Sequence, residues 1–269
     1  MSDRRTWPIV VGGCHRSGTS LVRRLLDSHS RIHCGPELGF FRDFYGDYRD
    51  DPLAHLRFAR TLRSIVPERN ALELLGRALV EAHERAARSS GKARWADKAP
   101  ENVVYLDAWS ALLGDRFFLL HVVRNPLDTV ASMRGRFPLT LPESLVGLAD
   151  HYRRYTEAGL RFATAAPERS HRIVYEELCA DPGATLAQAL GRLGEDLEAP
   201  QLALNATSHQ AGLEDPDVAD TDGVHAQSLG RWRSRLSEAE AASVWERTHD
   251  VWEACDPERR WVETPLPRP

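Results

Sequence analysis

Long hydrophobic runs are missing from this sequence. Residues 1–6 are polar, and the apolar stretch that follows them has only a few residues. A membrane-spanning helix needs about 20 apolar residues, and the core of a signal peptide also needs a longer stretch than this one. We therefore expect a cytoplasmic protein without a membrane span.

The sequence also lacks a basic excess and has little cysteine. It holds 35 Lys and Arg against 39 Asp and Glu, for a net charge of −4. Because nucleic-acid-binding domains usually carry a broad basic surface, we expect no nucleic-acid partner. The 4 cysteines are widely spaced and include no CxxC pair. This spacing favours reduced thiols and indicates neither a zinc site nor a disulfide framework.

The residues that are present predict one α/β domain over residues 1–269. A chain of 269 residues with 42% hydrophobic residues can form one sizeable core. Short strands are predicted at residues 7–12, 93–96, 117–123 and 172–175, and helices at 19–28, 53–65, 71–88, 101–113, 125–135, 142–164, 181–193 and 237–254. Strands that alternate with helices predict a central parallel sheet flanked by helices, with ligands beyond the carboxyl ends of the strands.

A loop of small residues, Gly13 to Ser20, follows the first predicted strand. Between a strand and a helix, such a loop points backbone N–H groups at one place, where the helix dipole also favours an anion. The common nucleotide-binding loop is GxxxxGK[ST], but Thr19 replaces its lysine here and Arg16 supplies the charge. A guanidinium can bind a phosphate or sulfuryl group through two hydrogen bonds. The alternative is a plain turn that only connects strand and helix.

A second anion site is predicted where strand 117–123 ends, at Arg124. Asn125 and Pro126 then start a helix, as N-cap and first helical residue. Ser132 lies in this helix, and Arg136, four residues later, is predicted on the same helical face. An arginine at a strand end is more often part of a surface ion pair. Next to the first loop, however, the three side chains fit a donor with phosphate on both sides of a ribose.

These motifs resemble those of the sulfotransferases that use 3′-phosphoadenosine 5′-phosphosulfate (PAPS), in the branch of protein-tyrosine sulfotransferases and bacterial relatives. Arg16, Ser17, Gly18, Thr19 and Ser20 are similar to the 5′-phosphosulfate loop of that family, Arg124 and Ser132 to its 3′-phosphate pair, and Arg136 to a cofactor-binding arginine of the tyrosine branch. The resemblance implies a P-loop-like sulfotransferase fold. It also implies PAPS as donor, adenosine 3′,5′-bisphosphate (PAP) as product, and no required metal.

Two downstream segments carry the same resemblance. Tyr175, in Tyr-Glu-Glu-Leu, is similar to a cofactor-contacting tyrosine of the family. Arg231 and Trp232, in Leu-Gly-Arg-Trp, are similar to its late basic loop, which closes over the donor. The resemblance therefore implies that all three residues contact the donor, with Trp232 near the adenine.

The resemblance also implies the catalytic residues. Glu37, in Cys-Gly-Pro-Glu, matches the general base of the tyrosine branch, and Lys98, in Asp-Lys-Ala-Pro, matches its transition-state lysine. Sulfuryl transfer is an in-line displacement, so Arg16 and Lys98 would neutralise charge while Glu37 takes the acceptor proton. Without the resemblance, Glu37 more simply caps a turn or pairs with Arg42, and Lys98 pairs with Glu101 on the surface.

This chain departs from the branch at two places. The branch pairs a cysteine equivalent to Cys34 with a second one at the position of Ala96. It also uses a serine upstream of the late loop, for which Asp220, Thr221 and Ser228 are the candidates, and we assign none. His15, in the first loop, and His33, near Glu37, are considered as minor candidates for a contact with the substrate or a catalytic role.

The acceptor is expected to be a small-molecule hydroxyl compound, such as a natural product, carbohydrate or lipid, with a peptide tyrosine as the alternative. Helical and loop insertions at about residues 38–90 and 199–227, together with 137–143, are expected on the acceptor side. Two other functions stay open: a P-loop small-molecule kinase that uses ATP and magnesium, and a nucleotide-binding module without catalysis. Thr19 and Arg124 argue against the kinase, because they stand where its lysine and its metal-binding aspartate are expected.

Overall fold

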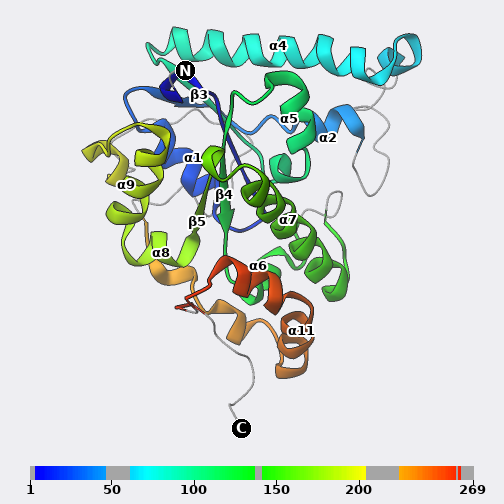
Figure 1. Cartoon of the computed structure of the whole chain (residues 1–269). Coiled ribbons are helices and arrows are strands. Elements are labelled where there is room, and N and C mark those ends of the chain that lie inside the picture. Colours follow the sequence, from blue (N-terminus) through cyan, green and yellow to red (C-terminus); the bar gives the residue numbers. More distant parts are fainter. Residues whose placement is uncertain (1–3, 47–60, 137–140, 204–223, 259, 262–269) are drawn as a thin grey trace.

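A five-stranded parallel sheet has the strand order β2-β3-β1-β4-β5. Figure 1 shows it running through the molecule, with β3, β4 and β5 labelled. The computed structural model describes residues 4–46, 61–136, 141–203, 224–258 and 260–261. The strands are β1 (Ile9–Gly13), β2 (Ile32–Cys34), β3 (Arg94–Lys98), β4 (Phe118–Val123) and β5 (Ser170–Val174). The predicted α/β fold with a central parallel sheet is therefore confirmed.

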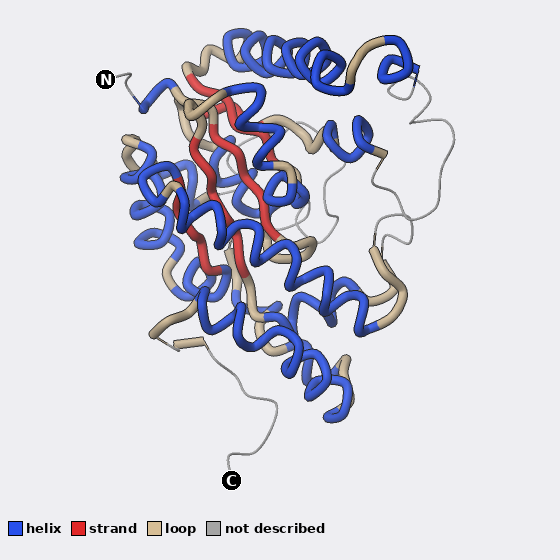
Figure 2. Tube along the Cα trace, turned by 45° about the vertical axis from the view of Figure 1, so that its right-hand side comes forward, coloured by secondary structure: helices blue, strands red, loops and turns tan. Residues whose placement is uncertain are grey.

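Helices cover both faces of the sheet (Figure 2). On one side, α1 (Thr19–Asp27), α8 (Tyr175–Ala180) and α9 (Pro182–Leu193) share a core with Val11 and Leu120. On the other side are α2 (Phe40–Tyr45), α4 (Glu68–Ser89), α5 (Leu106–Leu113), α6 (Pro126–Met133), α7 (Leu145–Ala165) and α11 (Glu238–Cys255). Their core includes Val10 and Leu119. Alternate strand residues thus enter opposite cores, which explains why the strands are continuously apolar.

Several predicted helix boundaries agree with the structure. Asn125 caps α6, because its side chain accepts a hydrogen bond from the backbone N–H of Leu127. Asp181 caps α9 in the same way through Ala184, and Ser237 forms a capping box with Glu240 at the start of α11. Each cap satisfies N–H groups that have no partner inside the helix.

Other elements differ from the prediction. No strand was predicted at β2, because its three residues are too few to show a period; its parallel pairing with β3 stabilises it. The predicted helix 101–113 is instead a 3-10 helix, Pro100–Val104, followed by α5. Tyr175 begins α8 and does not end β5. Most of the helix predicted at 53–65 lies outside the described residues.

The strand order places β1 between β3 and β4. The chain therefore leaves β1 toward one edge of the sheet through β2 and β3, and reaches the other edge through β4 and β5. Ligands of such sheets bind at this switch point, beyond the carboxyl ends of the strands. In β2 and β3, Cys34 lies directly opposite Ala96. Across the described ranges, no helix combines the length and the apolar character needed to cross a membrane.

Candidate functional site

Most of the predicted site residues lie just beyond the carboxyl ends of the strands. Arg16 follows β1, Glu37 follows β2, and Arg124 follows β4. Lys98 is the last residue of β3, and Tyr175 directly follows β5. The parallel sheet therefore gathers residues that are far apart in the sequence at one edge.

The loop after β1 has the form of an anion cradle. Arg16 has a left-handed backbone, with φ of 70°, and Gly18 has φ of 99°. A Cβ at Gly18 would lie 2.4 Å from the Tyr175 ring, so no other residue fits there. The Ser17 hydroxyl is buried and has no hydrogen-bond partner among the described residues. A buried donor without a partner, next to the first turn of α1, fits a phosphate or sulfuryl group.

Arg16 lies close to the residues predicted for the second anion site. Its Nε donates to the Ser132 hydroxyl at 3.0 Å, and Arg124 Nη1 donates to the Arg16 carbonyl at 3.1 Å. The Arg124 guanidinium also lies over the Tyr175 ring, 4.6 Å from its centre. The structure thus brings Arg16, Arg124, Ser132 and Tyr175 together.

Arg136 does not lie on the same helical face as Ser132, so this part of the prediction is wrong. Helix α6 ends at Met133, and Arg134 already has an extended backbone, with φ of −53° and ψ of 126°. Gly135 then turns the chain with φ of 71°. The sequence around Ser132 is helical in pattern, but the glycine ends the helix before Arg136.

The segment from Ala226 to Arg235, called the late loop below, lies against this group. Arg124 Nη2 donates to the Ser228 carbonyl at 2.5 Å, and the Tyr175 and Ser228 hydroxyls are 2.7 Å apart. Arg231 is exposed and donates to the Gln227 carbonyl at 2.7 Å. The Trp232 side chain is buried in the core beside α6 and α11, with Arg233 over its ring.

Lys98 and Glu37 form a second group, on the other side of the first loop. The Lys98 ammonium contacts the Glu37 carboxylate and lies 3.2 Å from the Ser20 hydroxyl. The Lys98 side chain is 1% exposed, whereas that of Glu37 is 20% exposed. The simpler alternative, a surface pair of Lys98 with Glu101, is therefore wrong. A buried ammonium needs a partner of opposite charge, and Glu37 supplies it.

Glu101 was not predicted as a site residue, but it pairs with Arg42 at 2.8 Å. The Glu101 carboxyl is almost fully buried, and burial raises its pKa to about 7. The Arg42 charge opposes this rise, and the nearby Glu37 charge adds to it. Glu101 directly follows Pro100, so it is fixed beside Lys98 by the 3-10 helix that begins there. A charged residue in that Pro-initiated turn was the only signal in the sequence.

His15 connects the first loop to Arg42. Burial, followed by the charges of His151 and Arg42, lowers the pKa of His15 well below its ordinary value, so the ring is neutral. Arg42 Nη2 lies 3.0 Å from His15 Nε2, and an arginine only donates, so this nitrogen accepts. His15 Nδ1 then donates to His151 Nε2, at 3.1 Å. His33 instead lies 3.7 Å from Asp27 and 3.4 Å from Ser90, in a different cluster.

Other predicted residues lie outside the described residues or outside the site. Asp220 and Thr221, like residues 137–140 and most of 199–227, are among those that the structure does not describe. Helix α4, in the 38–90 segment, packs on β3 and α5, and its His83 bonds to Asp97 at 3.1 Å. Within the described part of the chain, no group of three or more His, Cys, Asp or Glu side chains is arranged to hold a metal ion.

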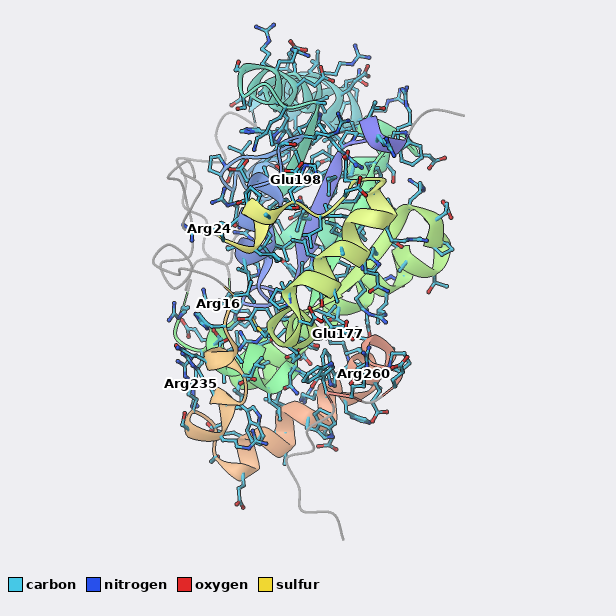
Figure 3. The ribbon with its side chains drawn as sticks, turned by 90° about the vertical axis from the view of Figure 1, so that its left-hand side faces the viewer. Arg16, Arg24, Glu177, Glu198, Arg235 and Arg260 are labelled. Atoms are coloured by element: carbon cyan, nitrogen blue, oxygen red, sulfur yellow. The ribbon has the colours of Figure 1, made fainter. Side chains whose placement is uncertain are left out.

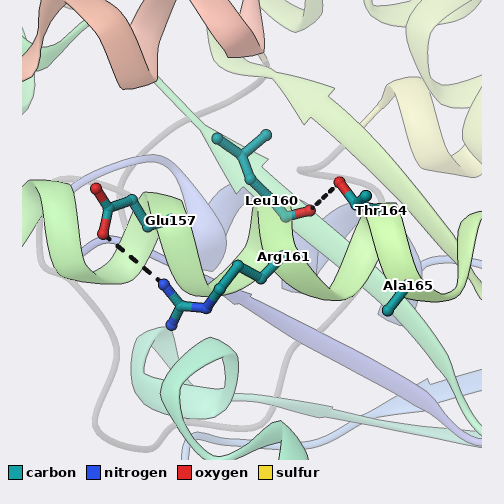
Figure 4. Close-up of a pocket in the computed structure, with 5 residues that line it drawn as sticks. All are labelled: Glu157, Leu160, Arg161, Thr164 and Ala165. Atoms are coloured by element: carbon teal, nitrogen blue, oxygen red, sulfur yellow. Dashed lines mark hydrogen bonds and ion pairs between the residues drawn. The ribbon is translucent and has the colours of Figure 1, made fainter.

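A depression of about 520 Å³ lies elsewhere on the surface (Figure 4). Among the described residues, those that line it belong to α7: Glu157, Leu160, Arg161, Thr164 and Ala165. The ion pair of Glu157 with Arg161 is part of this helix surface. None of the predicted site residues lines it, so it is not the candidate site.

Comparisons with known proteins show which family and fold this chain resembles. A family model described as the sulfotransferase family matches residues 8–199. The sulfotransferase domain of the Synechococcus PCC 7002 olefin synthase is 19% identical, with a TM-score of 0.68 over 93% of this chain and 94% of that one. The sulfotransferase domain of the curacin biosynthetic pathway is 16% identical, with a TM-score of 0.63 over 91% and 97%.

A more distant structure, mouse sulfotransferase SULT7A1 in complex with PAP, is 15% identical, with a TM-score of 0.50 over 95% of this chain and 87% of that one. A sequence search among curated proteins gives no match. The identities are low, so the structural likeness establishes the fold, whereas the family model covers most of the chain. The chain belongs to the sulfotransferase family.

Proposed function

We propose that this chain transfers a sulfuryl group from PAPS to the hydroxyl of a small-molecule acceptor. The observation that carries the proposal is the contact of Lys98 with both Glu37 and Ser20. It places a carboxylate and an ammonium beside the loop whose cradle fits an anion. A proton acceptor and a countercharge are the two groups that in-line sulfuryl transfer requires.

The residues fit a donor with two anionic ends. The loop from Gly13 to Ser20 would hold the 5′-phosphosulfate through its backbone N–H groups, the Ser17 hydroxyl and Arg16. On the opposite side, Arg124 and Ser132 would hold the 3′-phosphate. The family membership and the PAP-bound mouse relative support this donor. Arg136, Tyr175, Arg231 and Trp232 are proposed donor contacts on the resemblance alone.

In the proposed reaction, Glu37 accepts the proton of the acceptor hydroxyl while the hydroxyl oxygen attacks the sulfur of PAPS. A new S–O bond forms as the S–O bond to the 5′-phosphate breaks, and PAP is the leaving group. Lys98 and Arg16 offset the negative charge that develops on the leaving oxygen and on the sulfuryl oxygens. The reaction involves no change of oxidation state. The proton goes to Glu37, and the sulfuryl group goes to the acceptor oxygen.

The acceptor side lies around Glu37, whose neighbour Leu38 is 46% exposed. We propose a hydroxyl compound of natural-product, carbohydrate or lipid type as acceptor. The two sulfotransferase domains named above, from an olefin synthase and from the curacin pathway, support the natural-product class. Incubation with labelled PAPS and a panel of hydroxyl compounds, including a tyrosine peptide, identifies the class.

Calorimetry separates the proposal from its two alternatives. PAP is expected to bind without metal, at least tenfold more tightly than ATP with magnesium. Equal or tighter binding of ATP with magnesium would overturn the donor assignment in favour of a kinase. Tight PAP binding without transfer to any acceptor on the panel would favour a binding module.

A further inference from the structure

Helix α6 contacts the late loop through Asp128, a residue outside both predicted anion sites. Asp128 lies in the first turn of α6 and is only 4% exposed. One carboxylate oxygen accepts from the backbone N–H of Gly230 at 2.7 Å, and the other accepts from that of Trp232 at 2.9 Å. A single buried carboxylate therefore binds two N–H groups of the late loop.

These bonds are stronger than ordinary backbone contacts. Hydrogen bonds to an ionised acceptor are about twice as strong as those between neutral groups. The carboxylate is also stabilised by the N-terminal end of the α6 dipole. Gly230 has φ of 70°, which turns its N–H and that of Trp232 toward the same side chain. The loop backbone thus directs two N–H groups at the two oxygens of the Asp128 carboxylate.

The other end of the late loop is bound by residues of the proposed donor site. Ser228 contacts Arg124 through its carbonyl and Tyr175 through its hydroxyl. Arg124 would have to share its guanidinium with a 3′-phosphate, which weakens this attachment when the donor binds. Asp128 belongs to neither of the proposed anion sites, so its two hydrogen bonds to the loop need not break when the donor binds. The loop ends at Arg235, on the same side of the molecule as Arg16 (Figure 3).

We propose that Asp128 is a positioning residue that holds the late loop over the donor site before the donor binds. The inference rests on the proposed donor, PAPS. Ordering a free loop costs conformational entropy for each residue that is fixed, and a ligand that must order its own site binds more weakly. Because Asp128 fixes the loop when the protein folds, the binding of the donor does not have to supply the free energy of ordering the loop.

The test compares Asp128→Asn with Asp181→Asn. Asparagine keeps the shape of the Asp128 side chain but has only one acceptor oxygen. Its NH₂ group would face one of the two backbone N–H groups of the loop, and because both groups are donors, that hydrogen bond is lost. We expect the Kd of PAP to rise at least tenfold, or about 1.4 kcal/mol. The donor kcat/KM should fall by a similar factor, and kcat at saturating PAPS should fall less. Asp181 caps α9 through Ala184, where asparagine caps equally well, so this control should match the wild type.

Hydrogen exchange gives a measurement that needs no donor. In ligand-free Asp128→Asn, peptides that cover residues 226–235 should exchange faster than in the wild type, while peptides of α9 should not change. Unchanged exchange in the loop, or unchanged PAP affinity in a folded Asp128→Asn protein, overturns the inference. If wild-type protein does not bind PAP, the proposed donor fails, and the exchange result still decides whether Asp128 holds the loop.

A second variant covers the case in which Asp128→Asn does not fold. Gly230→Ala leaves α6 intact but strains the left-handed backbone at Gly230, where φ is 70°. The same weakening of PAP binding and the same faster exchange are expected. Wild-type values for both measurements would overturn the inference.

Discussion

The two halves of the site satisfy their charges in different ways. On the donor side, Arg16 donates to the Ser132 hydroxyl, and Arg124 donates to the backbone carbonyls of Arg16 and Ser228. On the acceptor side, Lys98 pairs with Glu37 and Arg42 pairs with Glu101. The donor side therefore brings two guanidinium groups together, which suits the binding of an anion, whereas on the acceptor side each of these two cations has a carboxylate partner.

This comparison separates binding from turnover. A substitution on the donor side should weaken the binding of PAP, because it removes a contact to the anion. A substitution on the acceptor side should reduce kcat while PAP still binds. Variants that reverse this pattern would contradict the assignment of the two halves, and variants that follow it would support the assignment.

The largest effect is expected for Glu37→Gln. Glutamine keeps the size of the side chain but cannot accept the acceptor proton, so kcat should fall by about 10²–10⁴-fold. PAP binding should stay within about threefold of the wild type, since Glu37 is outside the anion cradle. Single-turnover assays with labelled PAPS and calorimetry with PAP measure the two quantities.

Glu177→Gln is the matched control for this variant. Glu177 pairs with Arg260 away from the site (Figure 3), so its substitution should leave turnover unchanged. Full activity of Glu37→Gln would remove Glu37 as the base. A parallel loss of PAP binding would place Glu37 in the donor half instead.

A smaller effect, on binding, is expected for Arg124→Ala. A hydrogen bond to a charged group contributes about 1.5–3 kcal/mol, so the Kd of PAP should rise by roughly 10–100-fold. Arg124→Lys should restore only part of the affinity, because lysine cannot form two parallel hydrogen bonds. Calorimetry with PAP checks both variants. Wild-type affinity in Arg124→Ala would contradict the 3′-phosphate assignment.

The local backbone around the donor side was easier to predict than the side-chain contacts of the acceptor side. The loop at Gly18 and the start of α6 at Asn125 are set by local rules, namely glycine conformation and helix capping, which a sequence displays. The pairing of Arg42 with Glu101 and the contacts of His15 with His151 depend on how distant elements pack. No local pattern shows such contacts.

The position of Arg136 was mispredicted and β2 was missed, each for a reason of its own. The helical pattern around Ser132 continues past Met133, but the backbone turns at Gly135 and ends the helix. The three residues of β2 form a strand only because β3 lies beside them. Asp128 lies in the first turn of α6, where carboxylates are common in any helix. Its contact with the late loop can be recognised only in the folded structure.

The smallest effect is a pH dependence that distinguishes two buried carboxyls. Burial raises the pKa values of two carboxyls to about 7. One is Glu101, on the acceptor side, and the other is Glu176, which lies near Arg124 and Asn125 on the donor side. Each therefore binds a proton in the folded state that it has lost in the unfolded state between about pH 4.5 and 7. Folding stability contributed by each group must then fall as the pH rises through this window.

Replacing either residue with glutamine removes its share of this fall, on the order of 1–3 kcal/mol. Urea unfolding at pH 5 and pH 7.5 should show that both variants lose less stability than the wild type as the pH rises. Only Glu101→Gln should also change the pH profile of kcat, because Glu101 pairs with Arg42 near Glu37, whereas Glu176 accepts from the backbone of Asn125. A kcat profile altered equally by both variants would show that charge is shared across the two halves.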